Sequence, residues 1–152
     1  MKKLTSLLSL LLVHSTLANS AHAAAPSSIE ANKKVVTAFY DLAFNQHQPK
    51  EAMDRYVGDR YTQHNPFVAD GKQPFIDFFV PFFKKNPDVR ADIKRVIAEG
   101  DLVVLHVHSK LNAADRGRAV MDIFRVENGK IVEHWDVGQP IPEKPANSNT
   151  MF

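Results

Sequence analysis

The sequence predicts an α+β domain in which N-terminal helices cover one face of a curved, mainly antiparallel sheet. Hydrophobic residues recur with a helical period up to about residue 86, and with a period of two from Val89 onward. Helices that precede all the strands, rather than alternating with them, are typical of this class. The chain has 152 residues, 44% of them hydrophobic, which is enough for one domain with one core.

Residues 1–23 have the pattern of a secretory signal peptide. Lys2 and Lys3 form a basic start, residues 4–13 are apolar, and residues 21–23 are a small-x-small cleavage site. The apolar run is too short to span a bilayer as a helix. Its removal leaves 17 basic and 17 acidic residues. We therefore expect a periplasmic or secreted protein that binds neither nucleic acid nor, once the signal is cleaved, membrane.

The rest of the chain is expected to comprise a linker over 24–28, one domain over 29–140 and a C-terminal tail over 141–152. There is no cysteine. This excludes a disulfide framework, a thiolate nucleophile and a Cys-ligated metal.

Three helices are expected before the sheet. A capping box at 27–30 starts the first, which should fade around 45–48. Pro49 suits the first position of a second helix over 49–57. Residues 60–66 then form an extended segment or a loop, because an asparagine precedes the proline there.

The third helix should begin at Gln73 and carry five phenylalanines at helical spacing. Pro81 should kink or shorten it. The stripe is typical of a core-facing helix, and part of it can equally wall an apolar ligand cavity, since the two roles are compatible. The five are Phe75, Phe78, Phe79, Phe82 and Phe83.

Four strands should follow as an antiparallel meander, with tight turns at Glu99-Gly100-Asp101 and Asn128-Gly129. A longer polar connection joins the second strand to the third. The expected strands are Val89–Ala98, Leu102–Leu111, Arg118–Val126 and Lys130–Val137.

Asp122 is the first candidate for chemistry. Alternation places it between Val120 and Phe124 on one side of its strand. Assigned to the helix-covered face, it becomes a carboxylate in apolar surroundings, which strengthen a base. The alternative is a buried Asp–His pair whose side chains hydrogen-bond each other and have no role in chemistry.

The Asn-Gly turn leaves the partner of Asp122 open. A two-residue loop would place Trp135 opposite Asp122, whereas a turn with a glycine bulge would place His134 there. We prefer the bulge, which also brings Asp136 to the same face.

His106 and His108 share one side of the preceding strand. We assign that side to the helix-covered face, so that one of them lies near Asp122. The other face would then expose a large apolar patch, which predicts a homodimer packed through the sheet. That patch would consist of Val103, Leu105, Val107, Ile123 and Trp135.

A second polar cluster lies in the segment Tyr61-Thr62-Gln63-His64-Asn65-Pro66. By pattern alone it fits a turn with a satisfied histidine. It also fits a loop that lines the site, with Tyr61, His64 and Asn65 as binding residues.

These segments resemble the SnoaL-like polyketide cyclase family of the nuclear transport factor 2-like superfamily. The resemblance rests on the Tyr-x-Gln-His-Asn-Pro loop, on Asp70-Gly71 before a Phe-rich helix, and on the motifs Asp122-Ile123-Phe124-Arg125 and Glu133-His134-Trp135-Asp136. It covers nearly the whole mature chain. It implies a cone-shaped barrel with a deep pocket between helices and sheet.

The resemblance also implies roles. Characterised cyclases of this family close a ring by an aldol reaction without metal or cofactor, using an acid on the third strand and a histidine on the strand before it. Asp122 matches the acid, and His106 or His108 matches the histidine, with His108 preferred because it lies nearer the mouth of the pocket. His64 and Asn65 match the loop motif.

The resulting hypothesis is cofactor-free acid/base chemistry on a small apolar carbonyl compound, of the aldol-type cyclase, isomerase or lyase kind. Asp122 would take a proton from a carbon beside a carbonyl while His108 or His106, with His134, hydrogen-bonds the enolate or Asp122 itself. Phe75, Phe79 and Phe124 would exclude water.

A non-catalytic binding protein of the same fold is the second hypothesis. A metal site built from the His106-x-His108 pair with His64 and His134 is the third.

Overall fold

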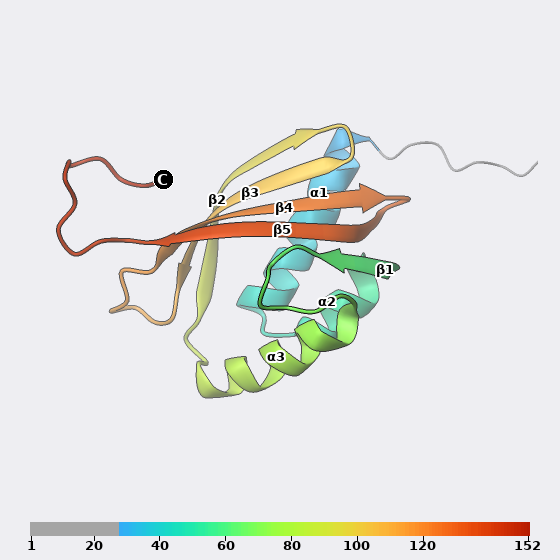
Figure 1. The fold of residues 1–152 in the computed structure, drawn as a ribbon, viewed down its shortest axis with the longest axis horizontal. Helices are drawn as coiled ribbons and strands as arrows, with labels where there is room; N and C mark the ends of the chain where they lie inside the picture. Colours follow the sequence, from blue (N-terminus) through green and yellow to red (C-terminus); the bar gives the residue numbers. More distant parts are fainter. Residues whose placement is uncertain (1–27) are drawn as a thin grey trace, which may run out of the picture.

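The computed structural model describes residues 28–152, so the expected signal peptide and nearly all of the linker lie outside the described residues. Three helices and a five-stranded sheet form the domain, and Figure 1 shows the strands fanning across the molecule with the helices on one side of them. The predicted α+β class is confirmed. The five-stranded sheet does not close into the barrel that the resemblance implied.

The first two helices follow the sequence signals closely. Helix α1 (Ile29–Tyr40) is capped by Ser28, whose Oγ accepts the Ala31 N–H, rather than by the preceding serine. It continues into the π-helical turn η1 (Asp41–Asn45). Helix α2 (Pro49–Tyr56) starts with its proline at the first helical position, as expected.

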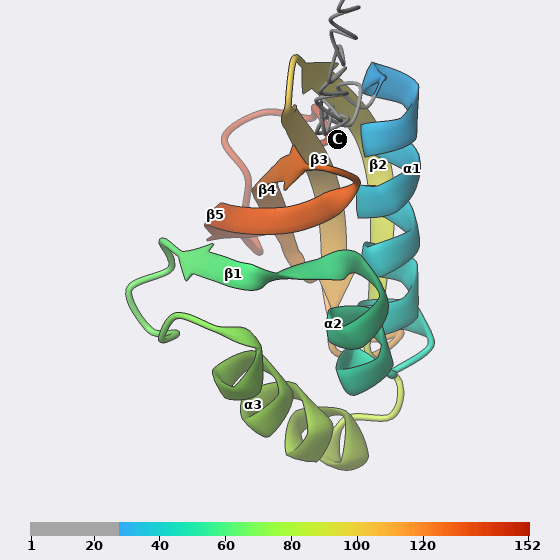
Figure 2. The same cartoon turned by 90° about the vertical axis from the view of Figure 1, so that its right-hand side faces the viewer.

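Helix α3 (Lys72–Lys85) lies beyond the β1 edge of the sheet and packs against α2 (Figure 2). Pro81 does not shorten it, since the helix runs four residues further. Phe75 and Phe83 are buried, whereas Phe78 on the other side is 56% exposed. The phenylalanine stripe is therefore core along one side only. In the described part of the chain, no helix is long and apolar enough to cross a membrane.

The sheet contains the four predicted strands and one more. The order is β1-β5-β4-β3-β2, antiparallel except for the edge pair β1–β5, which is parallel. Strand β1 overlaps the segment 60–66 that the sequence left as extended or loop, and it begins at Val57, which the sequence assigned to the second helix. The strands are β1 (Val57–Gln63), β2 (Arg90–Glu99), β3 (Leu102–Lys110), β4 (Arg118–Glu127) and β5 (Lys130–Pro140).

The β4–β5 hairpin corrects both predicted registers. Asn128 and Gly129 have positive φ values of 51° and 74°, as a two-residue type I′ turn requires. Val132 then has no partner, because Val126 pairs with Ile131 and the preceding residue, Arg125, pairs with Glu133. This bulge at Val132 places His134 and Asp136 on the same face as Asp122, as we expected from a bulge at the turn. The residue directly opposite Asp122, however, is Asp136.

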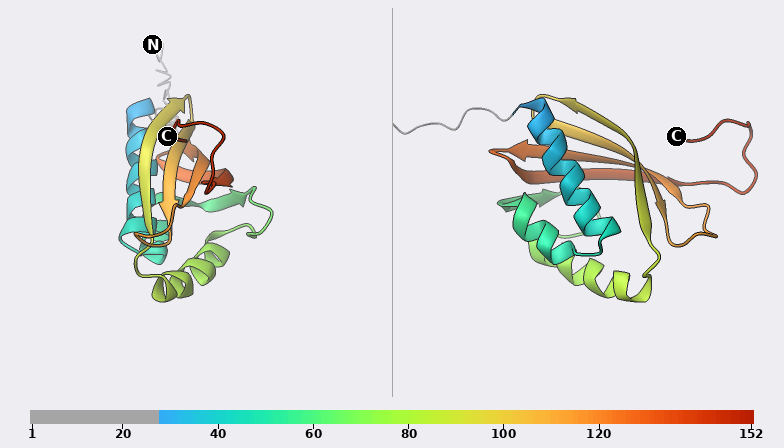
Figure 3. Two further views of the ribbon diagram at one scale, coloured as in Figure 1. Left: turned by 90° about the vertical axis from the view of Figure 1, so that its left-hand side faces the viewer. Right: turned by 180° about the vertical axis from the view of Figure 1, so that it is seen from behind.

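The register of β3 against β4 overturns the assignment of the faces of β3. Leu105 pairs with Asp122, and Val103 pairs with Phe124, so these valine and leucine side chains share the helix-covered face with Asp122. Val103, Leu105 and Val107 are fully buried there. His106 and His108 lie on the opposite, outer face. The physical reason is that α1 packs against β2, β3 and β5 and selects the most apolar side of β3 (Figure 3).

The expected apolar patch on the outer face accordingly changes its composition. One residue from each of four adjacent strands forms a row across that face, which we call the outer row. Ile97 in it is 56% exposed. The outer row consists of Ile97, Val104, Ile123 and Trp135.

The C-terminal tail extends past the end of β5 and then turns back toward the sheet (Figure 1). Residues 142–150 are exposed, whereas Phe152 is partly covered and stacks on His108 with ring centroids 4.5 Å apart. An open hollow of about 560 Å³ beside Phe152 is lined by Lys94, Arg95 and His108, among others. This hollow is on the opposite side of the sheet from Asp122.

Candidate functional site

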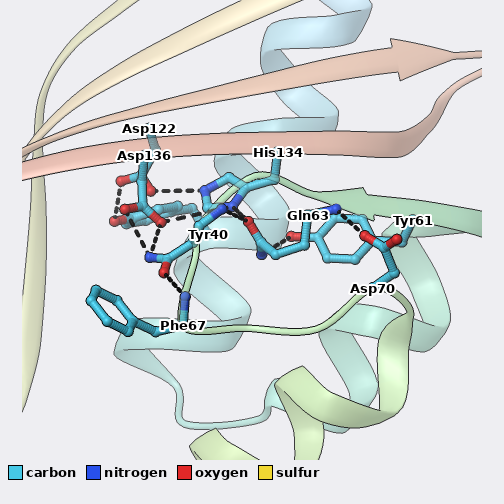
Figure 4. Close-up of polar contacts among 9 residues, drawn as sticks. Tyr40, Tyr61, Gln63, Phe67, Asp70, Asp122, His134 and Asp136 are labelled. Atoms are coloured by element: carbon cyan, nitrogen blue, oxygen red, sulfur yellow. Dashed lines mark hydrogen bonds and ion pairs between the residues drawn. The ribbon is translucent and has the colours of Figure 1, made fainter.

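Asp122 on β4 is the centre of a buried polar network on the helix-covered face. The residue is 6% exposed and the neighbouring His134 on β5 is 8% exposed. Tyr40 at the end of α1 donates its hydroxyl to Asp122 Oδ2 at 2.8 Å, and His134 Nε2 lies 3.0 Å from Asp122 Oδ1. The carboxylate is therefore held between a phenol and an imidazole (Figure 4).

Gln63 at the end of β1 contacts the other side of the imidazole. Its Oε1 lies 2.9 Å from His134 Nδ1 and also accepts the backbone N–H of Asn65 at 2.9 Å. The parallel pairing of β1 with β5 makes this possible, because it places Gln63 directly beside His134.

Asn65 and Asp136 lie at the more exposed end of the network. The Asn65 amide nitrogen lies 2.8 and 3.0 Å from the two carboxylate oxygens of Asp136, whose side chain is 24% exposed. Asn65 Oδ1 accepts the backbone N–H of Phe67. Asp136 Oδ2 is also 4.0 Å from His134 Nδ1. Polar groups thus run without interruption from buried Tyr40 to a partly exposed carboxylate.

Backbone and side-chain hydrogen bonds fix the loop that carries Gln63 and Asn65. Asp70 Oδ1 accepts the Gln63 N–H at 2.7 Å, and the His64 N–H donates to the His134 carbonyl at 2.9 Å. The Gly71 N–H donates to the Tyr61 carbonyl. The loop is consequently tied at both ends to strands of the sheet, which is how two polar side chains are delivered to a buried site.

Aromatic side chains surround the network on its buried side. The Phe124 ring is 4.7 Å from the His134 ring and meets Tyr40 and Phe39 edge to face. Phe75 is 5% exposed, and Phe79 packs on it with ring centroids 4.4 Å apart. All three predicted aromatic residues lie on the Asp122 side of the sheet. The apolar surroundings inferred for Asp122 are present.

Burial determines the ionisation of the two tyrosines. It raises the pKa of Tyr40 well above the ordinary value, and the negative charge of Asp122 raises it further. Burial likewise raises the pKa of Tyr61, again with a smaller contribution from Asp122. Both hydroxyls therefore keep their protons over the physiological range, and Tyr40 remains a donor to Asp122.

Three of the predicted site residues do not join the network. His106 Nδ1 lies 2.9 Å from Arg95 Nη1, and His108 Nε2 donates to the Arg116 carbonyl at 2.8 Å, both on the outer face. The His64 ring stacks on Trp135 at 4.6 Å and bonds Glu133, so it also turns outward. The assignment of His106 or His108 beside Asp122 is wrong, because the side of β3 that carries these histidines faces outward and not toward the helices.

Two residues of the network are missing from the sequence prediction. Tyr40 gave no signal, because an aromatic residue at helical spacing on α1 reads as core. Gln63 belongs to the Tyr-x-Gln-His-Asn-Pro loop motif, but the binding role was assigned to His64, the next residue, because an imidazole is the more common functional group. Tyr61, predicted as a binding residue, is buried and touches the network only through Gln63, at 3.5 Å.

Asp122, His134 and Asp136 also form a group that could hold a metal ion, with donor atoms within 4.8 Å of one another. The carboxylate oxygens of this group already have hydrogen-bond partners, namely Tyr40, Asn65 and the imidazole, so they need no ion. The histidines of the metal hypothesis are not together, because His106 and His108 lie on the opposite face from His134. We therefore assign no metal to the site.

Comparison with known proteins agrees with this fold. Residues 36–134 match the family model of the SnoaL-like domain, which is more than half of the chain. The chain belongs to the SnoaL-like domain family. No curated protein matches it.

Solved structures show the same architecture at low sequence identity. A proposed polyketide cyclase from Bacillus cereus is 20% identical with a TM-score of 0.60, and the match covers 71% of this chain and 74% of that one. A proposed polyketide cyclase from Acidithiobacillus ferrooxidans is 18% identical with a TM-score of 0.59, covering 74% and 91%. AclR, a proposed hydroxylase from Streptomyces galilaeus, is 18% identical with a TM-score of 0.57, also covering 74% and 91%. These likenesses establish the fold.

Proposed function

We propose that the protein is a cofactor-independent enzyme that performs acid/base chemistry on a small apolar carbonyl compound, as an aldol-type cyclase, isomerase or lyase. The observation that carries this proposal is the Asp122 carboxylate, buried among aromatic rings and held by two donors, Tyr40 and His134. The names of the cyclase-like structural neighbours are consistent with such a reaction.

In the proposed step, Asp122 removes a proton from a carbon next to the carbonyl group. The electron pair of the broken C–H bond moves to the carbonyl oxygen, which becomes an enolate, and the proton remains on Asp122. Tyr40 Oη and His134 Nε2 lie 2.8 and 3.0 Å from the two carboxylate oxygens of Asp122 and orient the carboxylate. They replace the histidine of β3 in the role that the sequence suggested.

The expected ligand is apolar because the partly buried side chains around the site are apolar. Phe44, Phe79, Ile93 and Val120 pack against the core while keeping part of their surface exposed. Val120 lies two residues before Asp122 on the same face of β4. We expect the carbonyl compound to bind beside Val120, with its reactive carbon facing the Asp122 carboxylate.

The test uses enolisable β-keto esters, beginning with ethyl acetoacetate, in D₂O. We expect the wild type to accelerate deuterium incorporation at the carbon between the carbonyls, measured by proton NMR. Asp122→Asn should lower this rate by about 10²–10⁴-fold. Asp77→Asn, at an exposed position on α3, is the matched control and should keep the wild-type rate. An Asp122→Asn variant as active as the wild type would refute the assigned role.

The alternative function is a non-catalytic binding protein of the same fold. It is favoured by the complete hydrogen bonding of the network, since every buried side-chain nitrogen and oxygen within residues 28–152 has a partner. The same keto-ester panel separates the two functions. Saturable binding of the esters without deuterium exchange, or mass-spectrometric detection of a co-purified apolar compound, supports the binding protein.

We also propose export, on the basis of the basic start, apolar run and cleavage motif of residues 1–23. Expression of the full chain in a Gram-negative host should yield periplasmic protein beginning at Ala24. Mass spectrometry of the intact protein gives the cleavage position. A chain that keeps residues 1–23 and stays in the cytoplasm would contradict export.

A further inference from the structure

We propose that Gln63 is a positioning residue that holds a proton on His134 Nδ1 and thereby requires one further proton to be shared between His134 Nε2 and Asp122 Oδ1. This inference rests on the proposed function only in the use it assigns to that proton. The arrangement itself follows from hydrogen-bond directions in the free protein.

The first step is the orientation of the Gln63 amide. The backbone N–H of Asn65 points at one end of this amide at 2.9 Å. A backbone N–H can only donate, so the atom facing it must be the carbonyl oxygen Oε1 rather than the amide nitrogen. The amide nitrogen then lies toward the Tyr61 hydroxyl, at 3.5 Å. Backbone geometry thus excludes the flipped amide.

The second step concerns His134 Nδ1, which lies 2.9 Å from the same Oε1. A carbonyl oxygen has no proton to give, so Nδ1 must be the donor and carry a hydrogen. The carboxylate of Asp136, 4.0 Å away, stabilises that hydrogen electrostatically. Gln63 therefore selects the protonated form of this nitrogen.

The third step concerns Nε2. A neutral imidazole has a single N–H, which is already on Nδ1, so Nε2 would present a lone pair to Asp122 Oδ1 at 3.0 Å. Two lone pairs do not form a hydrogen bond. The Tyr40 proton is directed at the other carboxylate oxygen, Oδ2. One additional proton must lie between Nε2 and Oδ1, either as an imidazolium beside a carboxylate or as an imidazole beside a carboxylic acid.

Both descriptions give the Asp122–His134 pair the same net charge of zero. The arrangement differs from a catalytic triad, in which the carboxylate accepts from one ring nitrogen and leaves the other free as a base. Here neither ring nitrogen is free. In its imidazolium–carboxylate form the pair holds a transferable proton beside the base: Asp122 takes the proton from carbon, and Nε2–H then gives its proton to the enolate oxygen, which leaves a neutral imidazole.

The loop geometry explains why a glutamine can impose this state. Its backbone N–H is tied to Asp70 at 2.7 Å, and the next residue is tied to the His134 carbonyl at 2.9 Å. The backbone of Gln63 is therefore held beside the imidazole, and the Asn65 N–H holds Oε1 in place.

The test is a ¹⁵N NMR spectrum of the histidine side chains of the mature protein, without any ligand, at neutral pH. His134 is assigned with a His134→Gln variant. In the wild type we expect both ring nitrogens of His134 to have the shifts of protonated nitrogens. In Gln63→Met, which keeps the size but lacks the acceptor, Nδ1 should move to the shift of a lone-pair nitrogen while Nε2 keeps a hydrogen for Asp122. Gln63→Glu restores an acceptor and should restore the protonated Nδ1.

Gln73→Met, an exposed glutamine on α3, is the matched control and should give the wild-type spectrum. A wild-type His134 with a lone pair on Nδ1 would overturn the proposal, as would an unchanged His134 spectrum in a folded Gln63→Met. If Gln63→Met does not fold, the wild-type spectrum still decides the question. Lack of keto-ester exchange alone would count against the proposed function and leave this proton assignment intact.

Discussion

Asp122 and His134 are not opposite one another in the sheet, yet their side chains meet at 3.0 Å. Asp122 pairs with Asp136 and Phe124 pairs with His134, so the contact is diagonal across the β4–β5 ladder. Diagonal neighbours lie within reach of long side chains on the same face. The bulge at Val132 keeps both on the helix-covered face.

The contact between Tyr40 and Asp122 should contribute measurably to stability. Tyr40→Phe removes one of the two donors to a buried carboxylate, so we expect the free energy of unfolding to fall by about 1–3 kcal/mol. Urea denaturation followed by circular dichroism measures it. Tyr56→Phe, at a partly buried position on α2, should change it by less than about 0.5 kcal/mol. Equal effects of the two substitutions would contradict a special role for Tyr40.

Stability should also fall in alkali because of the two buried tyrosines. Their pKa values are raised on folding. Their contribution is therefore complete below the pKa of an unfolded tyrosine, about 10, and is lost progressively above it. Urea midpoints at pH 9, 10 and 11 should decrease in that order, and the decrease should be smaller in Tyr40→Phe. A midpoint independent of pH in this range would show that Tyr40 and Tyr61 ionise as freely in the folded state as in the unfolded one.

The two histidines of β3 should be dispensable for chemistry. They lie on the outer face, where their partners are Arg95 and the Arg116 carbonyl. The double variant His106→Ala/His108→Ala should exchange keto-ester protons within about 2-fold of the wild-type rate, as for substitutions remote from a site. A loss comparable to that of Asp122→Asn would restore the assignment made from the sequence.

The aromatic surroundings of the pair should be critical for folding. Phe124 is 1% exposed and packs against Phe39, Tyr40 and His134. Phe124→Ala should lower the free energy of unfolding by about 3–5 kcal/mol. Phe67→Ala, at a position 94% exposed, should change it by less than about 0.5 kcal/mol. Thermal denaturation of both variants measures the two losses of stability. Equal losses would contradict a special role of Phe124 in core packing.

The outer row remains the predicted surface for a homodimer. Ile123→Lys places a charge in the middle of this row, where it would be desolvated on association. Light scattering coupled to size exclusion at micromolar concentration should show a dimer for the wild type and a monomer for Ile123→Lys. Gln73→Lys on α3 adds the same charge away from the outer face and should remain dimeric. A monomeric wild type would refute the dimer.

Much of the fold follows from local signals. The capping pattern near Ser28, the proline at position 49 and the Asn-Gly turn each act within a few residues, and the corresponding elements appear where expected. Strand β1 was less visible, because its sequence Val-Gly-Asp-Arg-Tyr-Thr-Gln has no clear alternation. It becomes a strand by parallel pairing with β5, and such a distant pairing leaves no local pattern.

The site was predicted only in part, for a related reason. Asp122, His134 and Asp136 share one face because alternation and one bulge determine it. The wrong histidines were added because alternation sorts a strand into two sides without saying which of them faces the core. On β3 one side carries Val103, Leu105, Val107 and Ser109, and the other carries two apolar residues, two histidines and a lysine.

By itself, the sequence determined the helices, four of the five strands, the carboxylate in apolar surroundings and the resemblance to the SnoaL-like family. Short-range propensity and periodicity suffice for these features. The tertiary structure decided which face of β3 is buried and which partners hold Asp122. Tyr40 and Gln63 are 82 and 59 residues away from Asp122 along the chain. They reach the site only because helix packing and the parallel β1–β5 pair bring distant segments together.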